Sequence, residues 1–202
     1  MSIDMSGGRR TRSDSRQRIV AAAVELFSSQ GYAGTSIRDI AAALGMTKAS
    51  LYYYFESKDQ ILDAVTEPLR RELEDLVTRA STPPPPAPAD LLAEVVDVLS
   101  RHALLITTLF DDPSAFRNQQ AKQGLRKLAP ILASSTEPDA LLRARCAMGA
   151  VHAGVLGTAA VDARLAARLR GDQAVRLLAG EDHALDEELR EAVVRAALRT
   201  LG

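Results

Sequence analysis

Residues 35–55 read TSIRDIAAALGMTKASLYYYF, and the spacing within this stretch decides the fold of the first part of the chain. A short apolar-periodic helix comes first, with Ser36 and Asp39 spaced almost as a capping box at its start. Gly45 stands at a tight turn after it, and Thr47 can cap a second short helix. Two short helices joined by such a turn are typical of a helix-turn-helix.

The second of these helices has two faces of different character. Leu51 and Phe55 are four residues apart, so they share one face and can pack on the first helix. At about 100° per residue, Ala49 and Tyr53 point away from that face, and the other two tyrosines lie on its flanks. Three adjacent aromatic residues span about 200° of a helix, so at least one of them must be exposed.

Aromatic residues are scarce elsewhere, since the chain holds only 4 Tyr, 4 Phe and no Trp. An exposed tyrosine beside Lys48 suits hydrogen bonding to phosphate and packing on sugars or thymine methyl groups. The spacing therefore favours a DNA-binding helix pair. A helical adaptor that binds another protein through its tyrosines is the rival interpretation, and steep weakening of binding by salt would exclude it.

The segment from Arg16 to Leu62 resembles the TetR family of bacterial transcriptional repressors. The matching residues are Ile19, Ala22, Ala23, Leu26, Phe27, Gly31, Tyr32, Thr35, Ser36, Ile40, Ala41, Gly45, Leu51, Tyr52, Tyr54, Phe55, Lys58 and Leu62. The resemblance needs no gap and covers about a quarter of the chain. It implies a DNA-binding domain of three helices, the third of which is the recognition helix.

By position, the resemblance implies two groups of DNA-binding residues. Candidates that face the groove are Thr47, Lys48, Ala49 and Tyr53, with Lys48 the best candidate for a base edge. Arg38 is a candidate for a base or a phosphate contact. Candidates for phosphate contact are Thr35, Ser36, Tyr52 and Lys58, where a solvated helix end is the alternative for Lys58. Five arginines between positions 9 and 18 form either a minor-groove arm or a solvated helix start.

Helical periodicity continues through the rest of the chain, with a break at STPPPPAPA. Four successive prolines predict an extended connector there, with a ligand for a proline-binding domain as the alternative. Later apolar stretches span 91–109, about 122–133, about 138–165 and about 185–201. We expect an all-α, TetR-like fold of about nine helices, in which a helix-turn-helix domain precedes a helical ligand-binding and dimerisation domain.

The expected domains follow from these boundaries. They are a flexible basic tail at 1–12, a DNA-binding domain at 13–57 with its motif at 36–55 and a family-type match at 13–73, a connecting helix at 58–80, a proline-rich linker at 81–89, and the ligand-binding and dimerisation domain at 90–202.

Small residues are dense on the helix after Pro138, which allows another helix to approach closely. With the last helix they resemble the family's dimer interface, a four-helix bundle shared by two subunits. Internal packing within one chain is the alternative. The expected interface residues are Gly149, Ala150, Ala153, Gly154, Gly157, Leu189, Val193, Val194, Ala197 and Leu198.

The ligand pocket has only a weak sequence signal. Candidate lining residues are Leu105, Leu109, Phe110, Phe116, Leu125, Leu128, Met148 and His152. This set is largely apolar, which favours an apolar effector, and its few aromatic residues disfavour a quaternary ammonium ligand. His102 and His152 can orient a ligand or be ordinary satisfied histidines.

Other function classes find little support. Cys146 and His152 diverge by about 120° on a helix, which is poor geometry for a nucleophile and its base. We see no metal-ligand spacing and no Gly-rich phosphate loop, so we expect no enzyme activity, no metal and no cofactor. One cysteine and no long apolar run indicate a cytoplasmic protein without membrane contact. The expected partners are a double-stranded DNA operator, a small-molecule effector and a second copy of the chain.

Overall fold

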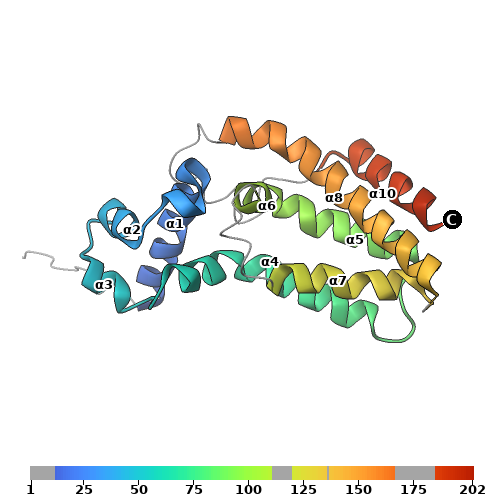
Figure 1. Ribbon diagram of the computed structural model, residues 1–202, viewed down its shortest axis with the longest axis horizontal. Coiled ribbons are helices and arrows are strands. Elements are labelled where there is room, and N and C mark those ends of the chain that lie inside the picture. Colours follow the sequence, from blue (N-terminus) through green and yellow to red (C-terminus); the bar gives the residue numbers. More distant parts are fainter. Residues whose placement is uncertain (1–11, 111–119, 136, 167–184) are drawn as a thin grey trace, which may run out of the picture.

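The computed structural model describes residues 12–110, 120–135, 137–166 and 185–202. Regular structure within these ranges is entirely helical, which confirms the expected all-α fold (Figure 1). The helices are α1 (Arg12–Gly34), α2 (Ile37–Ala43), α3 (Lys48–Tyr52), α4 (Lys58–Ala80), α5 (Pro88–Arg101), α6 (Ala103–Phe110), α7 (Gln120–Ala133), α8 (Pro138–Ala166) and α10 (Glu187–Leu201). Phe116 and the tail up to residue 11 lie outside the described residues, and none of the described helices is long and apolar enough to cross a membrane.

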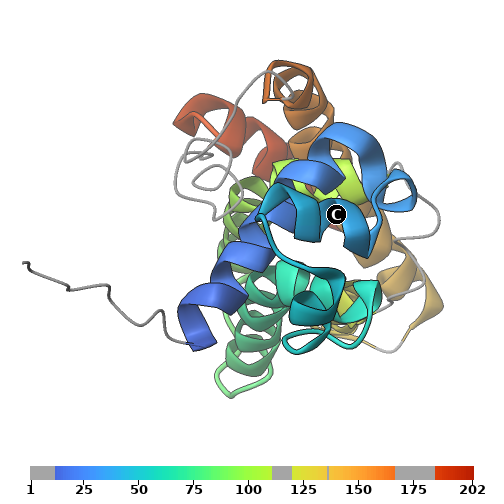
Figure 2. The same cartoon turned by 90° about the vertical axis from the view of Figure 1, so that its left-hand side faces the viewer.

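Two hydrophobic cores organise the chain, and α4 belongs to both. Its first half contributes Ile61, Leu62 and Val65 to a core with α1, α2 and α3. Its second half contributes residues such as Leu73 and Leu76 to a larger core with α5, α7, α8 and α10. Figure 2 views the molecule from the side of α1, α2 and α3, with the other helices behind them. The helix-turn-helix is thereby joined to the second core through one continuous helix.

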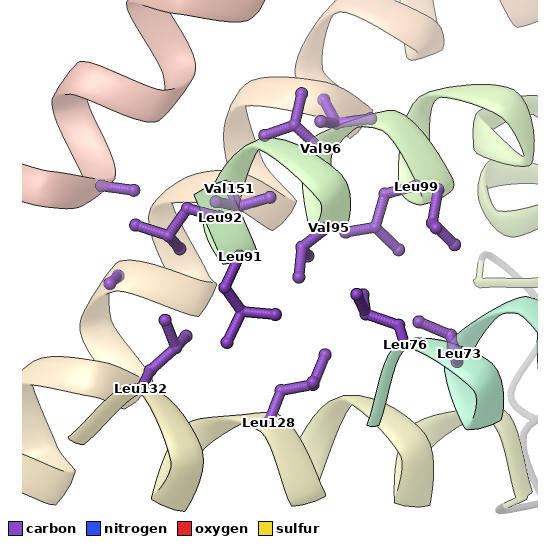
Figure 3. Packing of buried hydrophobic residues seen from close by; sticks show 14 of the residues in the cluster. Leu73, Leu76, Leu91, Leu92, Val95, Val96, Leu99, Leu128, Leu132 and Val151 are labelled. Carbon is purple, nitrogen blue, oxygen red and sulfur yellow. The ribbon is translucent and has the colours of Figure 1, made fainter. Parts of the chain in front are cut away.

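The second core consists almost entirely of aliphatic side chains. Figure 3 shows Leu128 and Leu132 of α7 pointing toward α5, with Leu73 and Leu76 of α4 beside them. Leu91 and Leu92 of α5 and Val151 of α8 close the cluster, and all these side chains are almost completely buried. Replacing one such leucine by alanine typically costs about 2–5 kcal/mol, so this core fixes the positions of α4 and α5.

Local caps set the short helices of the first core. Ser36 accepts a hydrogen bond from the backbone N–H of Asp39, and the Asp39 carboxylate accepts one from the N–H of Ser36, so the capping box is complete. Thr47 and Ser57 accept from the N–H groups three residues on and cap α3 and α4. Gly45 has a φ of 63°, which favours glycine at the turn. The caps expected from the sequence are confirmed.

Two boundaries differ from the sequence expectation. The stretch 91–109 was expected to be one apolar-periodic element, but α5 ends at Arg101 and α6 begins at Ala103, with a break at His102. Apolar periodicity alone does not reveal a one-residue turn, and the polar contacts of His102 described below favour it. The helix α5 also begins at Pro88, because proline is tolerated in the first turn, so the extended connector ends before residue 89.

Part of the small-residue pattern on α8 serves packing within the chain. A Cβ added to Gly154 would lie 2.7 Å from a methyl carbon of Val193 on α10, so only glycine permits this approach. Val193 and Ala197 are themselves buried against α8. The expectation that these three residues form the dimer interface is therefore wrong, since a sequence does not reveal which helix a small residue meets. Gly149, Ala153 and Gly157 remain exposed on α8.

Candidate nucleic-acid interface

The helix α3 is held to its domain by one face and leaves the other open. Leu51 and Phe55 are buried in the first core together with Ile40 of α2. Tyr53 is 65% exposed and Tyr52 is 42% exposed, which is unusual for aromatic side chains in a folded domain. Residues 47–50, in the first turn, are exposed as well. The two faces therefore lie as the sequence predicts, with Tyr54 half-buried between them.

Cations from two helices gather around the aromatic side chains of this region. The guanidinium carbon of Arg12 lies 5.0 Å from the ring centroid of Tyr53, and that of Arg16 lies 4.6 Å from the ring of Phe55. The ammonium of Lys48 lies 5.5 Å from the ring of Tyr52. The start of α1 and the helix α3 thus form one basic surface with exposed phenol hydroxyls, which suits contact with a phosphate backbone.

Arg12 and Arg16 are absent from the set of site residues that the family resemblance implies. Their sequence signal was the density of arginines between positions 9 and 18, which left open an arm or a solvated helix start. The structure places both on α1, over the aromatic rings of the helix-turn-helix. We therefore include both arginines among the candidate DNA contacts, in the role of phosphate ligands.

Two of the expected phosphate contacts are occupied by local structure. Thr35 is only 2% exposed, and its hydroxyl lies 2.8 Å from the carbonyl oxygen of Gly31, to which it donates. The expectation that its side chain meets a phosphate is wrong, because the hydroxyl closes the end of α1. Ser36 is exposed, but its hydroxyl donates to Asp39 at 2.6 Å. Hydrogen bonds from the Ser36 hydroxyl and backbone hold the pKa of Asp39 below its ordinary value, so this cap is ionised at neutral pH.

Lys58 has a role that neither sequence interpretation described. Its ammonium donates to the carbonyl oxygens of Tyr32 at 2.8 Å and Thr35 at 2.9 Å, and it lies 4.0 Å from the Tyr32 ring centroid. The Tyr32 hydroxyl donates to Asp59. Because these carbonyls lie in the last turn of α1 and just beyond it, Lys58 fastens the start of α4 to the end of α1. Two of its three donors are thereby used inside the domain.

The remaining candidates are exposed at the positions expected. Arg38 lies on the open side of α2, and Ala49 lies in the first turn of α3. The Thr47 hydroxyl accepts from the N–H of Ser50 and lies 2.9 Å from the Ser50 hydroxyl, so Ser50 joins this exposed first turn. Ser50 had no distinguishing signal in the sequence. The roles of these residues at DNA stay predictions.

The expected pocket residues do not come together as one described site. Leu105 belongs to the first core rather than the second, and Leu128 is buried in the second. Leu125 and Met148 pack against that core, and Leu109 and Phe110 lie in the last turn of α6. His152 is half-buried, and this burial lowers the pKa of its imidazole. A described cavity of about 400 Å³ lies where the start of α5 meets α7, α8 and the end of α10, and Pro88, Leu132, Arg143 and Leu198 line it. None of the expected pocket residues lines this cavity.

A helix-turn-helix with an exposed basic and aromatic face, joined by one long helix to a second helical core, defines a two-domain helix-turn-helix protein. Residues 19–65 match the family model described as bacterial regulatory proteins, tetR family. The N-terminal segment of the chain is therefore similar to the DNA-binding segment of the TetR family of bacterial transcriptional regulators.

Individual relatives agree with this assignment over part of their length. The HTH-type transcriptional repressor DhaR of Mycobacterium sp. (strain GP1) is 31% identical over 99 residues, which cover 47% of this chain and 50% of that protein. The negative regulator of the biofilm operon icaADBC, IcaR of Staphylococcus aureus (strain Newman), is 46% identical over 48 residues, which are 24% of this chain and 26% of that one. The chain thus spans half or less of the length of these relatives.

Solved structures share the whole architecture. A TetR-like transcriptional regulator from Rhodococcus sp. RHA1 superposes with a TM-score of 0.62 at 23% identity, over 96% of this chain and 98% of that one. A TetR/AcrR-family regulator from Thermobifida fusca YX-ER1 is 26% identical with a TM-score of 0.52, over 92% of this chain and 97% of that one. The fold beyond the matched N-terminal segment is therefore that of the family as well.

Proposed function

We propose that the chain is a transcriptional repressor that binds an inverted-repeat operator as a homodimer and is released by a small, mostly apolar effector. The main support for DNA binding is the basic surface of α1 and α3, where Arg12, Arg16 and Lys48 lie close to aromatic side chains that include the exposed Tyr52 and Tyr53. The formal net charge of the whole chain is only −1, so this local concentration of cations has no counterpart in the overall composition.

Insertion of α3 into a major groove is supported by its shape. The helix has only five residues, and its exposed first turn holds Lys48 and Ala49 beside the capping Thr47. First-turn side chains of a recognition helix reach base edges, while surrounding cations and hydroxyls meet phosphates. Lys48 is the proposed base contact, Tyr52 and Tyr53 the proposed sugar and phosphate contacts, and the two arginines of α1 additional phosphate ligands.

Dimerisation is supported by an unpartnered face of α8. Leu142 is 58% exposed, and Cys146, Gly149, Ala153 and Gly157 follow it at helical spacing, all exposed. A long stripe of apolar and small side chains suits close packing against the same stripe of a second copy. An operator with two half-sites about 34 Å apart also requires two recognition helices, which one chain does not provide.

Release by an effector is supported by the position of α4. One continuous helix contributes side chains to both cores, so a change in the second core that moves α4 also moves the helix-turn-helix. A ligand shifts this equilibrium only by its differential affinity for the two arrangements. We therefore expect the effector to bind within the second core, where it can move α4.

Fluorescence anisotropy with duplex DNA from upstream of the protein's own coding region tests this function. We expect saturable binding that is at least a hundredfold tighter than binding to a shuffled duplex of the same composition and that weakens steeply with salt. Equal affinity for both duplexes at moderate salt would contradict a sequence-selective regulator. Sedimentation of the same complex measures the number of chains bound per operator, and we expect two.

A further inference from the structure

A cluster of three titratable side chains lies where α5 turns into α6 against α4. His102 occupies the turn and is 1% exposed. Its Nε2 lies 2.9 Å from one carboxylate oxygen of Glu72 on α4, and Arg101 donates to the other oxygen at 2.6 Å and 3.1 Å. One carboxylate on α4 therefore holds both residues of the α5–α6 corner.

The protons in this cluster can be assigned from its chemistry. Burial raises the pKa of Glu72, but hydrogen bonds from Arg101 and His102 outweigh it and leave the pKa below its ordinary value. An ionised carboxylate only accepts hydrogen bonds, so Nε2 of His102 must carry the hydrogen between them. With the hydrogen on Nε2, Nδ1 is an acceptor whenever the ring carries a single hydrogen.

Nδ1 of His102 is buried and has no hydrogen-bond partner within the part of the chain that the structure describes. Buried polar atoms nearly always have a partner, so an unsatisfied one calls for an explanation, such as a bound water, ion or other molecule. The ring is in a special position, since Ala103 belongs to the second core and Leu105, two residues on, belongs to the first. The corner at His102 thus contacts α4 and passes directly into the core of the helix-turn-helix.

We propose that Nδ1 of His102 accepts a hydrogen bond from the effector, which is therefore an apolar molecule that carries a hydroxyl group. This inference rests on the proposed effector-responsive function. A carboxylate lacks a hydrogen to donate at neutral pH, and the cation of Arg101 next to His102 disfavours an ammonium ligand. Leu99 and Ile106, which flank the turn, are apolar and buried. We therefore expect the body of the ligand to be apolar.

The same geometry explains how a hydrogen bond between the effector and His102 affects the DNA-binding domain. A hydroxyl that donates to Nδ1 polarises the ring and strengthens the hydrogen bond from Nε2 to Glu72. The effector therefore changes the strength of the contact between the α5–α6 corner and α4. Because Leu105 packs in the first core, this change also affects the packing of that core. His102 acts both as a ligand contact and as the link between the two cores.

Nitrogen-15 NMR of the full-length chain tests the proposal without any substitution. The probes are straight-chain primary alcohols of four to twelve carbons, each paired with its methyl ether, which has the same oxygen but no hydrogen to donate. We expect at least one alcohol to shift the Nδ1 resonance of His102 and to bind at least tenfold more tightly than its ether. The proposal is overturned if no alcohol moves this resonance, or if alcohol and ether bind equally.

Two substitutions separate the two nitrogen atoms. His102→Gln keeps a donor that reaches Glu72 but lacks the Nδ1 acceptor, and we expect the preference for alcohol over ether to disappear. His102→Asn keeps an acceptor near Nδ1 but does not reach Glu72, and we expect the preference to persist. The opposite pattern contradicts the assignment. Operator binding of the unsubstituted chain is measured on the same sample, so absence of DNA binding with an intact alcohol preference overturns the proposed function alone.

Discussion

Lys58 and Tyr32 connect α4 to α1 in two ways, since the lysine ammonium donates to the Tyr32 carbonyl at 2.8 Å and lies 4.0 Å from the centre of its ring. The same ammonium donates to the carbonyl of Thr35 at 2.9 Å. The Tyr32 carbonyl also accepts from the backbone N–H of Thr35. Lys58 therefore adds a charged donor from the start of α4 at the C-terminal end of α1. This arrangement makes Lys58 a determinant of domain stability.

Replacing Lys58 by methionine is therefore expected to destabilise the protein. The substitution keeps most of the aliphatic length and removes the charged hydrogen bonds, which should cost about 1–3 kcal/mol of unfolding free energy. Urea unfolding followed by circular dichroism measures this quantity. The matched control is Lys48→Met on the exposed face of α3, which should change stability by about 0.5 kcal/mol or less. Equal stability of the two variants would show that the contacts of Lys58 contribute nothing.

Lys48→Ala and Tyr53→Ala are expected to weaken operator binding without unfolding the domain. Both side chains are exposed, Lys48 in the first turn of α3 and Tyr53 at its end. A base contact by Lys48 is worth about 1–3 kcal/mol of binding free energy, and we expect a smaller loss for Tyr53 as a backbone contact. Anisotropy titrations at fixed salt measure the loss, and Arg199→Ala on α10 serves as a control for the removal of an exposed cation far from α3. If either variant binds the operator as tightly as the unsubstituted chain, the role assigned to that residue is wrong.

Arg16→Ala separates phosphate contact from base recognition. Because Arg16 lies over Phe55 at the rim of the recognition helix, we expect it to weaken binding to the operator and to a shuffled duplex by the same factor. The slope of log affinity against log salt should fall by about one. A loss confined to the operator would instead assign Arg16 to a base or a groove.

Two glycines of α8 are expected to differ sharply in their effects. Gly154→Ala places a carbon 2.7 Å from Val193 and should destabilise the folded chain by about 1–3 kcal/mol through overpacking. Gly149 has nothing within 4 Å of an added carbon, so Gly149→Glu should leave the fold intact and place charge on the exposed stripe. Sedimentation equilibrium should then show weaker dimerisation for Gly149→Glu. An unchanged dimer constant would place the interface elsewhere.

The sequence predicted most of what is local. The caps at Ser36, Thr47 and Ser57 depend on residues three positions apart, and the faces of α3 depend only on helical periodicity, so both are visible in a linear pattern. The resemblance of one short segment to a known family added the order of the helices. Exposure of Tyr53 followed from the same periodicity, because the opposite face carries the buried Leu51.

What the sequence did not predict depends on partners far away in the chain. Lys58 meets carbonyls 23 and 26 residues before it, and Leu105 leaves its own domain to join the first core. Gly154 and Gly149 have similar sequence surroundings, but only Gly154 faces Val193. The turn at His102 is invisible in apolar periodicity because the helices on both sides of it bury apolar residues. Tertiary contacts of this kind determine which candidate is a site and which is packing.

The central claim is that the surface formed by α1 and α3 binds a specific operator as a dimer. Its most direct test is a titration of the upstream duplex monitored together by anisotropy and sedimentation, with and without Lys48→Ala. We predict saturation at two chains per inverted repeat, with a loss of about 1–3 kcal/mol for the variant. The claim would be contradicted by binding that does not saturate or by equal affinity for the operator and a shuffled duplex. Equal affinity of Lys48→Ala and the unsubstituted chain would contradict it as well.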